Sequence, residues 1–182
     1  MGASLRVFLG NPLWRKPGRL GGRAGSRWPF TMPVHEGERL PYYVPFPFYL
    51  SYAGAVLEQA GHQVLLVDGI AEGMEDQEFL SRAKAFRPDL IVLETSTPTI
   101  EVDLANAKAL KQLTSARVIL CGPHVTVEGK KILAENPFVD YVLAGEYEFV
   151  LRDLVEAFAK GSPLRDLHGV LFKEGEKIVD TG

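Results

Sequence analysis

The residues best suited to chemistry follow an apolar run that is too short for a helix. Residues 90–93 read Leu-Ile-Val-Leu, between Pro88-Asp89 and a hydroxyl-rich segment. This pattern predicts a strand buried on both faces, in the middle of a parallel sheet. The following loop carries hydroxyl groups on Thr95, Ser96, Thr97 and Thr99. Ligands bind at the carboxyl ends of strands in open α/β sheets, so these hydroxyls either contact a ligand or cap the next helix.

The remaining chain alternates short apolar segments with helical periods. We predict strands at residues 5–9, 63–67, 89–94, 117–121 and 141–144. Helices are predicted at residues 47–60, 75–86, 101–113, 126–135 and 147–159. Such alternation is typical of an α/β fold: a Rossmann-like (flavodoxin-like) doubly wound five-stranded parallel sheet with strand order 2-1-3-4-5. Residues 169–172 and 177–180 flank a turn near Gly175 and predict a C-terminal β-hairpin.

The predicted elements divide the chain into two parts. Residues 1–162 form a Rossmann-like domain, and residues 163–182 form the hairpin, after which the chain stops as if a longer protein continued. Residues 11–46 are predicted to be an irregular strap, because they show no helical or strand period and contain six prolines. The strap either packs on its own domain, or lies over a ligand or against a neighbouring domain.

The amino-acid composition excludes several classes of protein. The 182 residues carry a formal net charge of −3, which gives no sign of a nucleic-acid-binding face. No apolar run approaches the roughly 20 residues of a membrane span, and the N-terminus has no signal-peptide pattern, so we expect a cytoplasmic protein. The single cysteine, Cys121, excludes a disulfide framework, a zinc cluster and a chain-encoded iron–sulfur site.

The loops after the predicted strands contain no complete catalytic motif. There is no Gly-x-Gly-x-x-Gly fingerprint, Walker lysine motif or Gly-x-Ser-x-Gly elbow. His124 is either a general base or ligand, or a hydrogen-bonded structural residue. Cys121 is expected to pack as a small hydrophobic residue. We therefore assign no catalytic residue and no metal ligand.

Several segments together resemble a known family. The chain is similar to the N-terminal cobalamin-binding domain of cobalamin-dependent radical S-adenosylmethionine enzymes, in particular the anaerobic magnesium-protoporphyrin monomethyl ester cyclase type. The pairing of Thr95-Ser96-Thr97 with Gly122-Pro123-His124 is the most specific part of the likeness. The segments that carry it are residues 23–29, 45–47, 55–62, 67–69, 94–98, 122–124 and 145–148.

The resemblance implies a corrin across the carboxyl ends of the strands, with its nucleotide tail entering the domain. It implies that the tail is lined by Thr95, Ser96 and Thr97. The corrin or ribose phosphate would contact Gly122, Pro123 and His124, with Gly145 and Glu146 beside them and Asn11 and Pro12 under the corrin.

Two departures from related domains refine this expectation. The Asp-x-His-x-x-Gly motif that supplies a histidine to cobalt is absent, because the run Asp166-Leu167-His168-Gly169 has leucine at position 171. The expected cofactor is therefore cobalamin bound base-off and histidine-off. The Cys-x-x-x-Cys-x-x-Cys motif for an iron–sulfur cluster is also missing, so S-adenosylmethionine and the cluster would belong to a radical domain after residue 182.

The expected function is a cobalamin-binding module that is not catalytic by itself. Its parent would be a radical S-adenosylmethionine enzyme that performs methyl transfer, cyclisation or related radical chemistry. The alternative is a corrin-free interaction or sensor domain of the same fold. Small or hydroxylated residues at the strand ends favour the first.

Overall fold

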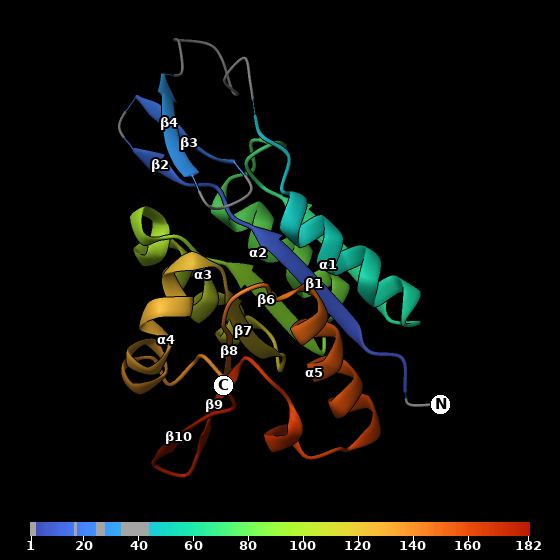
Figure 1. Cartoon of the computed structure of the whole chain (residues 1–182). Coiled ribbons are helices and arrows are strands. Elements are labelled where there is room, and N and C mark those ends of the chain that lie inside the picture. Colours follow the sequence, from blue (N-terminus) through green and yellow to red (C-terminus); the bar gives the residue numbers. More distant parts are fainter. Residues whose placement is uncertain (1–2, 17, 25–27, 34–43) are drawn as a thin grey trace.

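The fold is built on a seven-stranded mixed sheet with the order β10-β9-β8-β7-β6-β1-β5 (Figure 1). The computed structural model describes residues 3–16, 18–24, 28–33 and 44–182. Five strands of the sheet are parallel, and their order in the chain gives the predicted 2-1-3-4-5 arrangement. They are β1 (Arg6–Asn11), β5 (Gln63–Asp68), β6 (Leu90–Glu94), β7 (Arg117–Cys121) and β8 (Tyr141–Leu143).

The predicted C-terminal hairpin is present and extends this sheet. It consists of β9 (Val170–Glu174) and β10 (Lys177–Asp180), and it turns at Gly175, whose φ is 60°. β9 pairs antiparallel with β8, with Val142 opposite Leu171. Residues 163–182 therefore share one sheet with the preceding residues.

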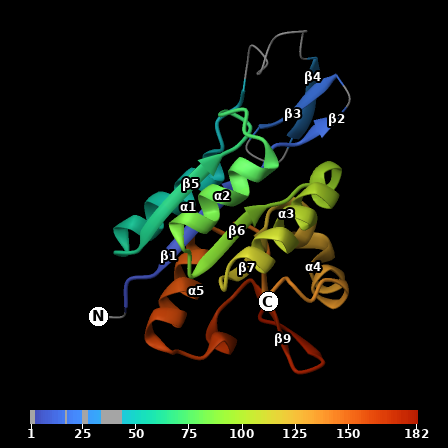
Figure 2. The same cartoon turned by 180° about the vertical axis from the view of Figure 1, so that it is seen from behind.

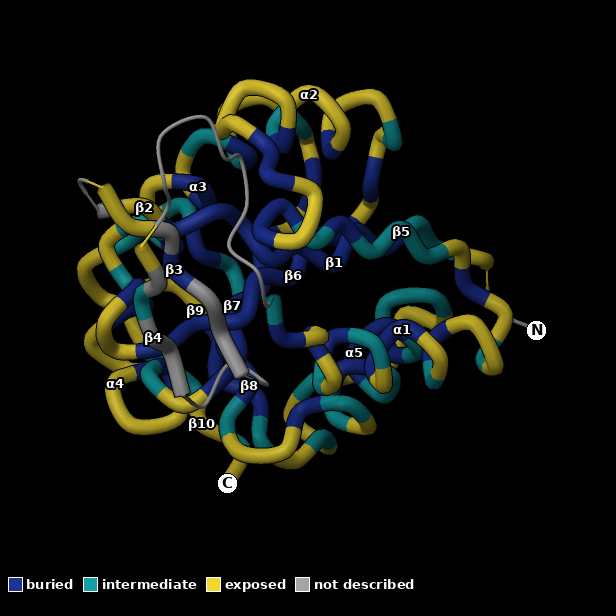
Figure 3. The backbone as a smooth tube through the Cα atoms, turned by 90° about the horizontal axis from the view of Figure 1, so that it is seen from above, coloured by how far each residue is buried: buried dark blue, intermediate teal, exposed yellow. Residues whose placement is uncertain are grey.

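Helices cover both faces of the sheet. α2 (Asp76–Phe86), α3 (Ile100–Leu113) and α4 (Pro123–Glu135) pack on one face, and α1 (Phe48–Gln59) and α5 (Glu148–Lys160) on the other (Figures 1 and 2). Viewed from above, the strands form a buried layer between these helices (Figure 3). Among the described helices, none is long and apolar enough to cross a membrane.

Strand alternation decides which side chains reach which face. Ile91 and Leu93 of β6 belong to the core beneath α2, α3 and α4, whereas Leu90 and Val92 belong to the core beneath α1 and α5. Successive side chains of a strand point to opposite faces, so a strand in the middle of the sheet must be apolar at every position. The same alternation sends the next residue, Glu94, toward α1 and α5.

The predicted strap is not irregular throughout. β2 (Arg15–Lys16), β3 (Arg19–Ala24) and β4 (Trp28–Pro33) form a small antiparallel sheet beyond the carboxyl end of β1 (Figures 1 and 2). The prediction of an irregular strap is wrong for these residues. Buried Trp14 packs against Gly21, where an added Cβ would lie 2.1 Å from the indole, and the Gly21 N–H donates to the Trp14 carbonyl at 2.6 Å. Residues 17, 25–27 and 34–43 of the predicted strap lie outside the described residues.

Candidate functional site

The carboxyl ends of the parallel strands open into a cavity of about 360 Å³ between α1 and α5. Its size lies within the range of small-molecule pockets, roughly 300–1,000 Å³. Four of its residues were predicted from the sequence as site residues: Gly122, Pro123, Gly145 and Glu146. The others were not predicted: Tyr49, Glu94, Thr126, Tyr147 and Glu148.

Gly122 shapes the wall where β7 passes into α4. Its φ of 98° and ψ of 179° lie in a region that only glycine adopts readily. A Cβ at this position would lie 2.5 Å from the Thr95 carbonyl oxygen. The Thr95 N–H and hydroxyl both donate to the Cys121 carbonyl, at 2.7 and 2.8 Å. The ends of β6 and β7 are therefore held too close together for any side chain at Gly122.

Thr126, in the first turn of α4, connects the two glycine loops at the rim. Its hydroxyl donates to the Gly122 carbonyl at 2.9 Å and accepts from the Gly145 N–H at 3.0 Å. Gly145 has a φ of 73°, and no atom lies within 4 Å of the point that a Cβ would occupy there. The rim at Gly145 therefore faces open space, with its backbone held in place by Thr126.

The hydroxyl groups after β6 bond to neighbouring protein groups. Buried Ser96 and Thr99 have their hydroxyl oxygens 2.8 Å apart, and Thr99 donates to the Asp103 carboxylate at 2.7 Å. Exposed Thr97 has its hydroxyl 3.2 Å from His124 Nδ1. These side chains shape the loop beside the cavity, and a contact with a ligand stays a prediction. The predicted site residues of this region that do not line the cavity are Thr95, Ser96, Thr97 and His124.

The inner wall of the cavity contains a buried acid beside two other titratable groups. Glu94 pairs in register with Cys121 on β7, and both side chains lie on the α1–α5 face. Burial, together with the negative charge of Glu94, raises the pKa of the Cys121 thiol and of the Tyr147 hydroxyl well above their ordinary values. Both groups are therefore neutral at physiological pH. The signal for Glu94 in the sequence was its alternation with Leu90 and Val92, because a strand end that carries an acid on a buried face is unusual.

Asn11 and Pro12 lie buried at the end of β1, outside the cavity lining. The Asn11 amide donates to Asp68 Oδ1 at 2.9 Å, while its own buried Oδ1 has no hydrogen-bond partner among the described residues. Gly10 of β1 pairs with Leu93 of β6, and continuing this pairing by one residue places Asn11 beside Glu94. A buried acceptor without a donor is costly, so this position suits a ligand N–H group.

The Asp68 carboxyl is expected to make the wild-type protein less stable as the pH rises. Replacing Asp68 with asparagine should remove this pH-dependent loss of stability. Burial raises the pKa of Asp68, and the N–H groups of Ala71 and Ile70 and the Asn11 amide only partly oppose this. A carboxyl whose folded pKa exceeds its unfolded value, about 4, binds more protons when folded, so the free energy of unfolding decreases as pH rises between the two values. The asparagine oxygen can still accept from Ile70 and Ala71.

Urea unfolding of D68N and wild type at several pH values checks this expectation. The stability of D68N minus that of wild type should increase with pH from about 4 and then level off above the folded pKa. A difference that decreases over the same window would mean that the folded pKa is lowered, and would contradict the prediction.

The cavity lining is acidic as well as apolar. Glu94, Glu146 and Glu148 line it, together with two tyrosines and Pro123, and no described lysine, arginine or histidine does. Across the described residues, no group of three or more His, Cys, Asp or Glu side chains could hold a metal ion. The arrangement therefore suits an organic ligand with flat apolar and hydrogen-bond-donating parts.

A family model for the B12-binding domain matches residues 41–155. The chain belongs to the B12-binding domain family. The match extends from the segment before α1 into α5 and includes every described residue that lines the cavity.

Curated relatives agree with this B12-binding domain assignment. An uncharacterized methyltransferase of Pyrococcus horikoshii is 30% identical over 133 residues, which are 72% of this chain and 29% of the relative. An anaerobic magnesium-protoporphyrin IX monomethyl ester cyclase of Cereibacter sphaeroides is 27% identical over 140 residues, 74% of this chain and 23% of the relative. The B12-binding domain thus spans less than a third of either relative.

Solved structures share the fold of this B12-binding domain. The radical S-adenosylmethionine methyltransferase TsrM of Kitasatospora setae, solved with cobalamin and a 4Fe–4S cluster bound, matches 98% of this chain and 29% of its own, with a TM-score of 0.72 and 18% identity. The cobalamin-dependent S-adenosylmethionine radical enzyme OxsB, with aqua-cobalamin and S-adenosylmethionine bound, matches 97% of this chain and 22% of its own, with a TM-score of 0.69 and 16% identity. The resemblance and the Rossmann-like fold predicted from the sequence are confirmed.

Proposed function

We propose that this domain holds cobalamin for a longer radical S-adenosylmethionine enzyme. The observation that carries the proposal is the cavity at the carboxyl ends of the strands, whose glycine rim leaves room for a ligand. The names of the matched methyltransferase and cyclases indicate methyl transfer or cyclisation as the chemistry of the parent. Bound cobalamin would supply a cobalt ion that carries a methyl group or an electron.

The described residues fit the parts of this cofactor. The mostly apolar cavity suits the nucleotide tail, with Gly122, Pro123, Gly145 and Glu146 around it. Asn11 offers a buried acceptor for an amide N–H of the corrin. The loop of Thr95, Ser96 and Thr97 borders this region.

We propose base-off and histidine-off binding for the cobalt. Among the described histidines, His124 directly follows Pro123 of the cavity lining; it is half-buried, and its Nδ1 lies 3.2 Å from Thr97 Oγ1. Its place in the first turn of α4, beside that hydroxyl, suits a structural role. The cytoplasmic location predicted from the sequence stays a prediction.

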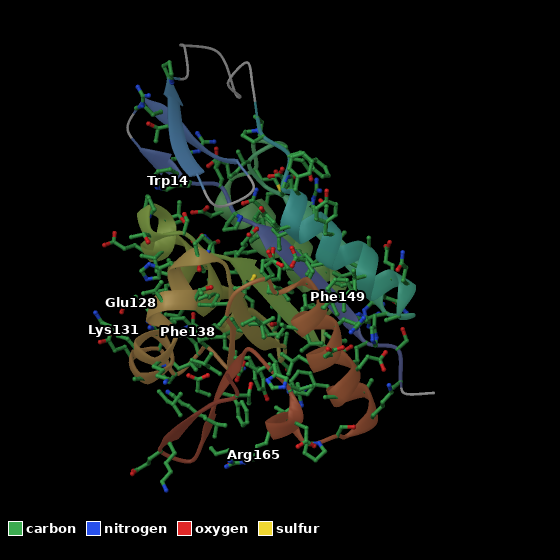
Figure 4. All side chains as sticks on the ribbon, viewed as in Figure 1. Trp14, Glu128, Lys131, Phe138, Phe149 and Arg165 are labelled. Carbon is green, nitrogen blue, oxygen red and sulfur yellow. The ribbon has the colours of Figure 1, made fainter. Side chains whose placement is uncertain are left out.

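Exposed aromatic side chains beside the cavity suit contact with the radical domain of the same parent. Phe46, just before α1, and Phe48 and Tyr52, in its first turns, are each more than half exposed. Phe48 contacts Phe46 edge-to-face and Tyr52 at a tilt, with ring centroids 5.2 and 6.4 Å apart. Phe149, at the start of α5, is 60% exposed (Figure 4). Clustered exposed aromatics are typical of surfaces that bind another protein. S-adenosylmethionine and the iron–sulfur cluster would belong to that domain.

Cobalamin binding can be tested directly on the purified chain. The chain is mixed with hydroxocobalamin, free ligand is removed by gel filtration, and the visible spectrum of the protein fraction is recorded. A retained corrin spectrum shifted to the base-off form supports the proposal. A retained histidine-ligated spectrum would keep cobalamin binding but reject the histidine-off mode. A colourless protein fraction would instead favour a corrin-free interaction or sensor domain.

A further inference from the structure

The main sheet ends at a strand that is paired on one side only. β5 is the last strand in the order, and β1 is its one partner among the described strands. The Gln63 N–H donates to the Leu5 carbonyl at 2.9 Å. Because backbone groups alternate in direction along a strand, the N–H and C=O groups of Val64 and Leu66 then point away from β1. These two residues present backbone groups that no other described strand pairs.

The other edges of the described sheets have features that prevent the addition of a strand. β10, at the far edge of the same sheet, has four residues and begins and ends with a charged one, Lys177 and Asp180. In the small sheet, the edge strand β2 has only two residues, and the edge strand β4 contains Pro29 and Pro33. Short length, charge and proline all protect an edge. β5 has six residues and, before Asp68 at its end, neither a charge nor a proline.

The side chains along β5 are apolar and only partly covered. Val64, Leu65 and Leu66 are each half-buried. Val64 and Leu66 pack on the side of α1 and α5, and Leu65 packs on the side of α2. Figure 3 shows β5 as a partly exposed band at the margin of the buried strand layer. A strand added beside β5 would therefore cover apolar surface on both faces of the sheet and pair the outward backbone groups.

The hydrogen bonds at the two ends of β5 restrict how another strand can pair with it. The His62 N–H donates to a carbonyl of α1 at 3.1 Å, and the Asp68 carbonyl accepts from an N–H of the following turn at 3.0 Å. The outward groups between them belong to Val64 and Leu66. In an antiparallel pair about a two-fold axis, a register that uses these two residues alone places Val64 opposite Leu66 of the second copy. Leu65 of one copy then lies opposite Leu65 of the other.

The charges on α2 also suit a second copy in this orientation. α2 is the helix nearest β5 on its face of the sheet (Figures 2 and 3). Its first turn contains Asp76 and Glu78, and its last turn and C-cap contain Lys84 and Arg87, all of them exposed. A two-fold axis at β5 makes the α2 helices of the two copies antiparallel, so the acidic end of each faces the basic end of the other. This surface is therefore complementary to itself.

We propose that β5 is a docking edge for a second copy of this domain. The two β5 strands pair antiparallel through Val64 and Leu66, and the two sheets become one continuous sheet across a two-fold axis. No residue of β5 belongs to the described lining of the cavity, so the docking edge is separate from the ligand site. The inference goes beyond the proposed function and does not depend on it.

Sedimentation velocity of the purified chain tests the proposed association. We expect wild type to change from monomer to dimer between about 1 and 200 µM, the range in which a small interface dissociates. Leu65→Lys and Leu65→Glu each place two like charges opposite each other at the axis, and each should weaken dimerisation about tenfold or more. Val179→Lys, at a half-buried position of β10 on the opposite edge, is the matched control and should leave the dimer unchanged.

A mixture of the two charged variants distinguishes a paired edge from a general loss of stability. Equal amounts of L65K and L65E place opposite charges at the axis, so the mixture should form a dimer about tenfold more tightly than either variant alone. A variant that only unfolds the domain cannot be rescued by another unfolded variant.

Each other outcome overturns the inference. If wild type stays monomeric over the whole range, or grows beyond a dimer, β5 does not pair about a two-fold axis. If V179K weakens association as much as L65K, or if the mixture does not recover the dimer, the contact is not an antiparallel pair centred on Leu65. Cobalamin retention enters none of these outcomes, so failure of the inference leaves the proposed function to its own test.

Discussion

The free energy of unfolding is expected to fall by about 3 kcal/mol or more when Gly122 is replaced by alanine. Two separate costs contribute. The backbone at φ 98° and ψ 179° is strained for a residue with a Cβ, which costs about 1–3 kcal/mol. The new methyl group would also lie 2.5 Å from the Thr95 carbonyl oxygen and 2.9 Å from the Thr95 nitrogen, which are backbone atoms that cannot rotate away.

This change should also damage the cavity. Relief of the clash requires the ends of β6 and β7 to separate, although two hydrogen bonds from Thr95 to the Cys121 carbonyl hold them together. Glu94 and Gly122, which both line the cavity, move with these strand ends. Urea unfolding gives the loss of stability, and cobalamin retention by the variant reports on the cavity.

The variant Gly145→Ala separates the cost of backbone strain from the cost of the steric clash. Gly145 also has a positive φ, of 73°, but no atom lies within 4 Å of its Cβ position. Only backbone strain applies there, so we expect a loss of about 1–2 kcal/mol. If both alanine variants lost the same stability, the close approach of Thr95 to Gly122 would not be a source of the effect.

The parallel sheet could be predicted from the sequence because each of its strands and helices is marked by a pattern within a few consecutive residues. Each strand is a short apolar run and each helix an amphipathic period, and the 2-1-3-4-5 order follows from the way such units wind. The hairpin was also predicted from its turn at Gly175. Its pairing with β8 could not be, because the register of Val142 and Leu171 depends on residues far apart in the chain.

The small sheet of β2, β3 and β4 was not predicted for a related reason. β3 reads Arg-Leu-Gly-Gly-Arg-Ala, which has neither alternation nor a strong strand propensity. Its Gly21 is explained by the ring of Trp14, seven residues earlier in the chain. Tertiary packing rather than pattern therefore determines this element.

Prediction of the site succeeded for some residue types and failed for others. Gly122 and Gly145 were predicted because the family resemblance implies them, and both line the cavity. The hydroxyl groups after β6 were predicted as possible ligand contacts because several of them follow one strand. In the structure they form hydrogen bonds with one another, with Asp103 and with neighbouring backbone. Glu94 and Tyr147 were overlooked because each was read as the end of a regular element, where an acid or an aromatic residue is common.

Replacing Thr99 with valine is expected to lower the free energy of unfolding by about 2–4 kcal/mol. Thr99 is fully buried at the start of α3, and its hydroxyl joins two other buried groups. It donates to Asp103 Oδ2 at 2.7 Å, which leaves its oxygen to accept from the Ser96 hydroxyl at 2.8 Å. Valine has the same shape but neither donates nor accepts, so a buried carboxylate loses a donor and a buried hydroxyl loses an acceptor.

Two further variants distinguish this hydrogen-bonded group from simple packing. Thr99→Ser keeps the hydroxyl and should cost only about 1 kcal/mol for the lost methyl group. In a D103N background, T99V should cost about 1–2 kcal/mol less than in wild type, because no buried charge then loses its donor. Urea unfolding of the four proteins in this double-mutant cycle measures the coupling. Equal costs of T99V in both backgrounds would show that Thr99 and the Asp103 carboxylate are not coupled, and would contradict the prediction.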